Sequence, residues 1–430
     1  MTQATSTAAD TLFFAGDVSV NEVTIVTSKG FSVTVTPQVA GIEIYEDLFS
    51  PFITGKIYVR DGHNITSLLP LVGEEYIKLD VTTPSIEKRY GYRAEYYIYK
   101  VDDRQITKER EEVFVIHFIS KEALIDLNRK VARSYSGNVG DIVRNIVTSD
   151  QGLESAKPVT VEPTSSNTKY TSNFWSPVRN IAFLCDAAVN ISNSAPSYIF
   201  FENKNGFYFV SLDYLYTGEV YQRFFYDNSN MVINPGGGSS RNIHRDYSRI
   251  IELDIPAPFD YIERIKSGTY GSQMTHYDLV TKKYTRVGYT PDFENTAHLN
   301  ENPMWSTRVV ARNSSVMINE FKHYGNFNGY RDVSNSKHAQ KRLSLLAQAE
   351  AYKVKITVPG RVDYSVGQVM DLVIPKRTQI TEAHAPEDFI DKILSGKYLV
   401  SAICHLITRD GHECVMELVK ESYMTNIENE

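Results

Sequence analysis

The sequence predicts a mainly β protein with α+β insertions, built from two related antiparallel β-barrels plus smaller inserted domains. Three observations predict this fold class. Apolar and polar residues alternate with a period of two over the first 120 residues, as in strands with one buried face. A helical period replaces this pattern after residue 120, and strand patterns return after residue 350. The order of turns and hairpins near the start also recurs near the end.

The first β-barrel is expected at 20–120, after a flexible N-terminus at 1–19. Alternation is clear at 31–36, and later short strands lead to a long hairpin that begins at Tyr96. Turn dipeptides separate the strands: Lys29-Gly30, Asp61-Gly62, Val72-Gly73 and Thr83-Pro84. Six or more short strands without intervening helices favour a sandwich or a small closed barrel.

An α+β domain is expected at 121–213. Helical spacing of apolar residues predicts three helices, at 124–131, 142–147 and 174–189. Pro177 stands near the start of the third, where its missing N–H costs little. Residues 154–172 are rich in Pro, Ser and Thr and predict a loop. The turn at 203–206 joins two apolar strands into a hairpin.

The second β-barrel is expected at 214–255 and 350–422. Between these segments, 256–349 predicts an inserted irregular β region that ends in a helix, and 423–430 is an acidic C-terminal tail. The Gly-rich run at 234–240 is read as a linker. The helix is expected over 336–352, and Leu343, Leu346 and Ala347 should lie together on its apolar face.

An internal repeat links the two barrels. The turn Val72-Gly73-Glu74 precedes a strand that ends at Pro84, and the turn Val366-Gly367-Gln368 precedes a strand that ends at Pro375. A long hairpin follows each strand, at an offset of about 300 residues. Duplication of a β module explains this order. Glycine turns and hairpins also recur in unrelated β proteins, so both explanations stay open.

Composition excludes several classes of protein. With 45 Lys plus Arg, 52 Asp plus Glu and a net charge of −7, the chain lacks the basic character of a protein that wraps nucleic acid. Three cysteines do not support a disulfide framework, so folding in a reducing cytosol is expected. Neither a signal peptide nor an apolar run of about 20 residues is apparent. The 28 tyrosines suit half-buried sheet faces and protein interfaces.

One cluster, Cys404-His405 with His412 and Cys414, has a metal-like composition. Zinc usually takes four converging N or S donors. Adjacent residues of a strand point to opposite faces, so Cys404 and His405 cannot both contribute. His412 and Cys414 can share a face across the turn at 410–411, which gives at most three ligands. The sequence therefore favours a core thiol with satisfied histidines over a metal site.

The other candidate catalytic or phosphate-binding motifs have no stronger support. Asp61-Gly62-His63 lacks the context of a nucleophile and is read as a turn. The glycines at 236–238 lack the Lys-Ser/Thr ending of a phosphate loop. Two carboxylate pairs are read as solvated turns or hairpin tips: Glu74/Glu75 and Glu111/Glu112. The sequence predicts no catalytic, cofactor-binding or metal residue, no cofactor and no enzymatic activity.

A set of short structural segments, in a fixed order over residues 20–422, resembles a known family. The segments are Ile44-Tyr45-Glu46-Asp47, Gly55-Lys56-Ile57-Tyr58-Val59-Arg60-Asp61, Leu69-Pro70-Leu71-Val72-Gly73-Glu74-Glu75, Phe200 to Leu212, Val358-Pro359-Gly360-Arg361, Val366-Gly367 and Tyr398-Leu399-Val400 leading to His405. Together they resemble the baseplate hub proteins of contractile-tailed (myovirus) bacteriophages, the tandem β-barrel hub family.

This resemblance implies a structural role in the virion tail baseplate, with assembly in the cytoplasm of the host bacterium. Such hubs are implied to be homotrimers whose two barrels per chain give six quasi-equivalent barrels in a ring. The ring would adapt a threefold spike protein to the sixfold tail tube protein, and baseplate wedge proteins are further candidate partners. DNA is expected to pass through without specific binding, and no membrane insertion is expected.

Two alternatives remain: a hub or spike-linked component of a related contractile injection system, and a tail-tip cell-wall hydrolase. Zymography on peptidoglycan separates the hydrolase from the structural roles. Residues 256–345 match no part of the family. Four tyrosines there are interface candidates: Tyr270, Tyr277, Tyr284 and Tyr330.

Overall fold

The computed structural model describes eleven segments of the chain, and every structural statement below concerns these residues: 14–62, 72–84, 91–108, 111–165, 167–226, 243–256, 260–278, 282–305, 314–320, 338–376 and 390–426. Residues named above that lie outside them include His63, Leu69-Pro70-Leu71, the Gly-rich run at 234–240 and Tyr330. Among the described residues, no helix is long and apolar enough to span a bilayer.

The fold class is confirmed: the protein is mainly β, and its largest element is one continuous sheet of 13 strands. The N-terminal part of this sheet, here called the first module, contains β1 (Ser19–Val26), β2 (Ser32–Thr34), β3 (Val39–Asp47), β4 (Thr54–Asp61), β5 (Tyr76–Thr82), β6 (Tyr92–Lys108) and β7 (Glu111–Ser120). A 3-10 turn, η2 (Thr36–Gln38), precedes β3. All of these strands except β2 contribute buried residues to one core.

The C-terminal part of the sheet, the second module, contains β13 (Val220–Phe225), β14 (Glu252–Asp254), β19 (Tyr352–Pro359), β20 (Val369–Val373), β21 (Gly396–Thr408) and β22 (His412–Lys420). The short helix α6 (Ile243–Tyr247) precedes β14. The paired order β5-β6-β7-β4-β3 in the first module matches β20-β21-β22-β19-β14 in the second. The turns before β5 and β20 also match, because Gly73 and Gly367 both have positive φ, at 97° and 84°.

The α+β unit contains α2 (Lys121–Asn128), β8 (Ser134–Asn138), α3 (Val139–Thr148), β9 (Val159–Val161), β10 (Asn167–Thr171), α4 (Pro177–Ala187), β11 (Tyr198–Asn203), β12 (Gly206–Ser211) and α5 (Leu212–Tyr216). Pro177 is the first residue of α4, as the sequence suggested, and the structure shows that Ser176 caps the helix. The expected loop at 154–172 instead holds β9 and β10, which pair with β12 and β8. Such short strands are too brief to show a periodic pattern.

The inserted region is more regular than expected. Its described residues form α7 (Tyr261–Ser267), the sheet β16-β15-β18, and α8 (Ala339–Ala349); the strands are β15 (Ser272–Asp278), β16 (Lys283–Tyr289) and β18 (Ser314–Glu320). A two-residue strand, β17 (Asn302–Pro303), pairs with β23 (Ser422–Tyr423), at the start of the expected C-terminal tail.

The expected apolar face of α8 is wrong. Leu343 is 45% exposed, whereas Gln340 and Gln348 are buried. Both amides donate to backbone carbonyls beside β15, Gln340 to Ser272 at 3.0 Å and Gln348 to Thr269 at 3.4 Å. The hydropathy pattern predicted the wrong buried face because two polar side chains are buried here: their amides donate hydrogen bonds to backbone carbonyls at or near the start of a neighbouring strand.

Candidate functional site at the junction of the two modules

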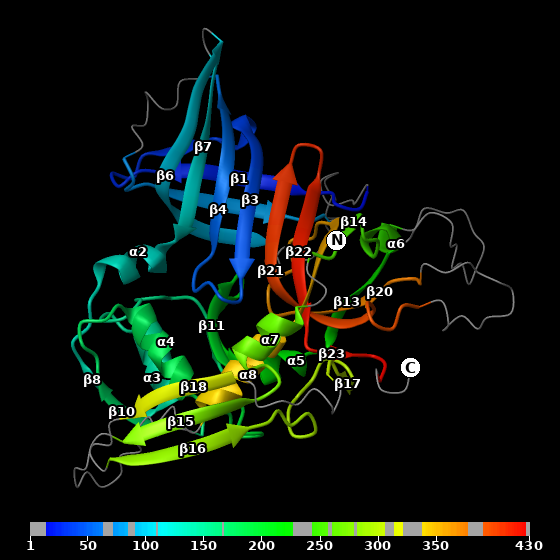
Figure 1. Cartoon of the computed structure of the whole chain (residues 1–430). Coiled ribbons are helices and arrows are strands. Elements are labelled where there is room, and N and C mark those ends of the chain that lie inside the picture. Colours follow the sequence, from blue (N-terminus) through cyan, green and yellow to red (C-terminus); the bar gives the residue numbers. More distant parts are fainter. Residues whose placement is uncertain are drawn as a thin grey trace, which may run out of the picture.

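The two modules are joined edge to edge by β3 and β21, which lie side by side in Figure 1. The pairing is antiparallel and runs from Asp47 opposite Ala402 to Gly41 opposite Thr408. It makes the two modules one sheet, and Ile407 of β21 packs into the first module's core. Backbone hydrogen bonds therefore resist rotation of one module against the other.

Glu46 of β3 ties three parts of the chain together at this junction. Its carboxylate, only 2% exposed, accepts the hydroxyl of Tyr92 on β6. It also accepts the Lys204 N–H from the β11–β12 turn at 3.0 Å. From the loop before β20 it accepts the Ser365 hydroxyl at 3.0 Å and the Val366 N–H at 3.1 Å. One side chain thus connects the first module, the α+β unit and the second module.

Burial dominates the electrostatics of Glu46. Desolvation raises the pKa of its carboxyl, and the hydrogen bonds from Tyr92 and Val366 oppose that rise. Desolvation and the nearby Glu46 charge raise the pKa of the Tyr92 hydroxyl well above its usual range, so Tyr92 remains a donor. The contacts of Glu46 are those of a residue that holds the structure together.

A second buried ionic group lies where the α+β unit meets the first module. Lys157 Nζ lies 2.7 Å from Glu122 Oε2 of α2 and 2.5 Å from Glu202 Oε1 of β11. The other oxygen of Glu202 accepts the Ile53 N–H at 3.1 Å, and the other oxygen of Glu122 accepts the Ser155 hydroxyl at 2.6 Å. The side chains of Glu122 and Glu202 are 4% and 1% exposed.

This triad is paired, as buried charges must be. Burial lowers the pKa of Lys157, but the charges of Glu202 and Glu122 outweigh it and the net shift is upward. Burial likewise raises the pKa of Glu202, and the Lys157 charge opposes that rise. Lysine is therefore held in its charged form between two carboxylates.

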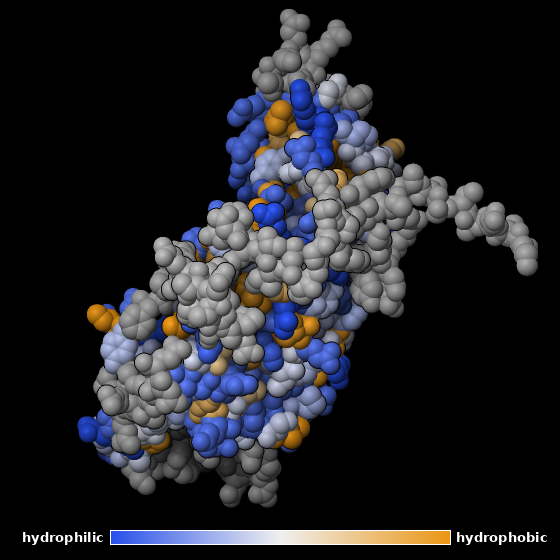
Figure 2. Space-filling model, turned by 90° about the vertical axis from the view of Figure 1, so that its right-hand side faces the viewer, coloured by the Kyte–Doolittle hydropathy of each residue, from blue (hydrophilic) through white to orange (hydrophobic). Residues whose placement is uncertain are grey.

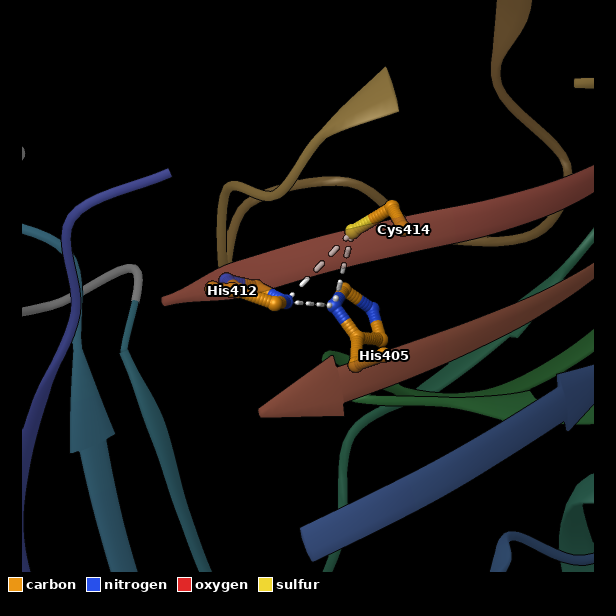
Figure 3. Close-up of side chains that lie close together, drawn as sticks. All are labelled: His405, His412 and Cys414. Carbon is orange, nitrogen blue, oxygen red and sulfur yellow. Dashed lines mark hydrogen bonds between the residues drawn. The ribbon is translucent and has the colours of Figure 1, made fainter. Parts of the chain in front are cut away.

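The structure brings together three of the four residues of the metal-like cluster (Figure 3). His405 of β21 and His412 and Cys414 of β22 point toward one another and are each at most 1% exposed. Cys404 lies on the other face of β21, as expected. The histidines are only partly satisfied: their rings contact each other and His405 interacts with the Tyr364 backbone, but His412 Nδ1 is buried without a hydrogen-bond partner among the described residues.

Among the remaining candidates, Asp61 and Glu112 lie opposite each other on the paired strands β4 and β7. Asp61 is not in a turn but is the buried last residue of β4. Glu75 is also buried, and its carboxylate accepts the N–H groups of Val72 and Gly73, so it builds the turn before β5. Of the candidate tyrosines, Tyr270 is buried, whereas Tyr284 is 51% exposed on β16 and remains an interface candidate.

The sequence reading missed Glu46, Lys157 and Glu202 as structural residues. One signal was available for Glu46, because it continues the buried alternation of Ile42 and Ile44. An acidic side chain at a core position of a strand indicates a buried partner. No comparable signal marks Lys157, which lies in an irregular segment.

The sequence matches no protein-family model and no curated protein. Three solved structures with a similar fold are tail proteins, two of them from prophages. A tail protein from Neisseria meningitidis MC58 has a TM-score of 0.56 at 10% identity, covering 93% of this chain and 96% of that chain. The 43 kDa tail protein of prophage MuSo2 from Shewanella oneidensis gives 0.55 at 10% identity, with 93% and 98% covered. Prophage tail protein gp18 from Listeria monocytogenes EGD-e gives 0.50 at 10% identity, with 93% and 94% covered. The chain therefore has the fold of these tail proteins over nearly its whole length.

Proposed function

We propose that this protein is the structural central hub of a contractile-tail baseplate in a phage virion. The observation that carries the proposal is the pair of modules with one strand order, fused through β3 and β21 within a single chain. The likeness in fold to phage tail proteins over 93% of the chain supports a place in the tail.

A threefold arrangement of the chain would explain why one chain contains two similar modules. Three copies arranged around an axis present six similar modules, so one face of the ring can meet a sixfold tail tube and the other a threefold spike. We propose that the modules arose by duplication and correspond to 20–120 and to 214–255 with 350–422. The α+β unit at 121–213 and the insertion at 256–349 are then the parts free to contact the spike or wedge proteins.

The buried charges support a mechanical role. Glu46 and the Lys157 triad cross-link the modules and the α+β unit, which suits a part that must transmit force without internal rotation. The net charge of −7 suits a channel through which DNA slides, because it offers little release of counterions. On the coloured part of the face shown in Figure 2, hydrophobic residues lie scattered among hydrophilic ones.

The purified chain is expected to form a trimer of about 146 kDa, three times its 48.8 kDa mass. Native mass spectrometry over a range of concentrations measures this directly. End-on electron-microscopy averages should show threefold symmetry with six similar lobes. A chain that stays monomeric at high concentration and binds neither spike nor tube protein, or that binds duplex DNA in a salt-sensitive way, contradicts the proposal.

A further inference from the structure

Three nitrogen and sulfur donors converge in the second module, near its junction with the first. His405 Nδ1 lies 3.1 Å from His412 Nε2. Cys414 Sγ lies 3.3 Å from His405 Nδ1 and 3.5 Å from His412 Nε2. The three side chains come from the facing strands β21 and β22, so strand pairing fixes their separation. Neither the fold comparison nor the proposed hub role accounts for this cluster.

The separations are those of ligands around one ion. Zinc bonds of about 2.0–2.1 Å to nitrogen and about 2.3 Å to sulfur, at the tetrahedral angle, give edges of about 3.3 Å between nitrogens and about 3.5 Å between nitrogen and sulfur. The observed triangle of 3.1, 3.3 and 3.5 Å is close to this one. Imidazole and thiolate donors suit zinc-like ions, whereas Mg²⁺ and Ca²⁺ prefer oxygen.

A metal-free core explains the cluster less well. Each neutral imidazole carries one N–H, so if one histidine donates to the other, their outer nitrogens become one bare acceptor and one N–H donor. Among the described residues, His412 Nδ1 is buried without a hydrogen-bond partner, which is costly for a purely structural polar pair, whereas the His405 ring interacts with the Tyr364 backbone. In a metal-free core the inner nitrogens and the Cys414 thiol can only hydrogen-bond to one another, whereas a bound ion uses all three atoms as ligands.

We propose that His405 Nδ1, His412 Nε2 and Cys414 Sγ bind one Zn²⁺ ion per chain. Among the described residues, no fourth His, Cys, Asp or Glu joins the group, so water or a backbone carbonyl completes the coordination. This site goes beyond the proposed hub function and does not depend on it.

The surroundings indicate what the ion does. The carbonyl of His412 accepts the Gly360 N–H at 2.7 Å, and the N–H of His412 donates to the Gly16 carbonyl at 2.8 Å. A Cβ at Gly360 would meet the His412 ring at 2.3 Å, so only glycine leaves room for the imidazole. Tyr92 of the first module packs edge-on against the His405 ring, with centroids 5.2 Å apart. The ion therefore fastens the β21–β22 hairpin where the N-terminal segment and both modules meet.

The test uses the purified full-length protein in its native oligomeric state. Elemental analysis should find one zinc per chain after growth with zinc. After the zinc is exchanged for Co²⁺, a near-ultraviolet thiolate-to-cobalt band should appear and should vanish when Zn²⁺ is added back. Loss of second-shell partners alone costs about 10–100-fold in metal affinity, so Cys414→Ser and His412→Gln should weaken Co²⁺ binding at least about 100-fold.

Cys404→Ser is the matched control, because Cys404 precedes His405 in the chain and its thiol lies on the opposite face of β21. The Cys404→Ser variant should bind Co²⁺ as the wild type does. X-ray absorption at the zinc edge of the wild type needs no variant and should show one sulfur and two imidazoles. A wild-type chain that takes up neither Zn²⁺ nor Co²⁺, a zinc site without sulfur, or a Cys414→Ser variant that keeps the cobalt band would each overturn the proposal.

Discussion

Replacing Lys157 with methionine is expected to lower the free energy of unfolding by about 3 kcal/mol near neutral pH. Methionine keeps most of the side-chain length but removes the charge between Glu122 and Glu202. Their side chains are 4% and 1% exposed, so neither can recover much hydration. Breaking a buried ion pair from one side is costly because the remaining charges stay buried without compensation. Urea denaturation followed by fluorescence measures the loss.

The deficit of this variant should depend on pH. In the wild type, burial already raises the pKa of Glu202 above its usual 4.5, and the Lys157 charge opposes that rise. Without Lys157 the folded state holds a proton on Glu202 more tightly than the unfolded state does. Protonation of Glu202 therefore stabilises the folded variant. The variant's loss of unfolding free energy relative to the wild type becomes smaller as pH falls toward 4.5 and larger as pH rises above it.

Lys29→Met is the control for this series, because Lys29 is exposed in the turn after β1 and its replacement should cost less than about 0.5 kcal/mol. Comparing the unfolding free energies of the two variants at about pH 5 and about pH 7 isolates the contribution of the Lys157 triad to stability. A deficit for Lys157→Met below about 1 kcal/mol would show that the triad does not stabilise the fold. A larger deficit that is equal at both pH values would contradict the expected coupling to protonation of Glu202.

Glu46→Ala is expected to be at least as damaging, with a loss of about 3 kcal/mol or more. The change leaves the Tyr92 hydroxyl, the Ser365 hydroxyl and the N–H groups of Lys204 and Val366 buried without their acceptor. The raised pKa of Glu46 shows that burying this carboxylate is itself costly, and that cost grows as pH rises above 4.5. Its removal is nevertheless worse, because four donors lose their partner at once.

Differential scanning calorimetry and urea denaturation measure this loss. Glu46→Gln should fall between alanine and wild type, because one carbonyl oxygen remains while an NH₂ group faces donors. Glu22→Ala, at an exposed position of β1, is the matched control and should change stability by less than about 0.5 kcal/mol. If alanine at position 46 is tolerated as well as alanine at position 22, Glu46 does not bind the modules together.

Much of the local structure followed from the sequence. The alternation over the first 120 residues predicted strands with one buried face, and on β5 Ile77, Leu79 and Val81 are all buried. Pro177 begins α4 as expected, because a proline at the start of a helix acts on the first turn alone. Leu127, in contrast, has helical spacing but is 71% exposed, since spacing does not say which face a neighbour covers.

The sequence by itself therefore determined the mainly β class, the principal strands and helices, and the pairing of His412 with Cys414 on one strand face, because these depend on residues close together in the chain. Only the tertiary structure decided that β3 pairs with β21, that Glu46 meets Val366 from 320 positions away, and that His405 joins His412 and Cys414. Such contacts depend on the register between distant strand edges and on loops that deliver donors to them. Local periodicity contains neither kind of information.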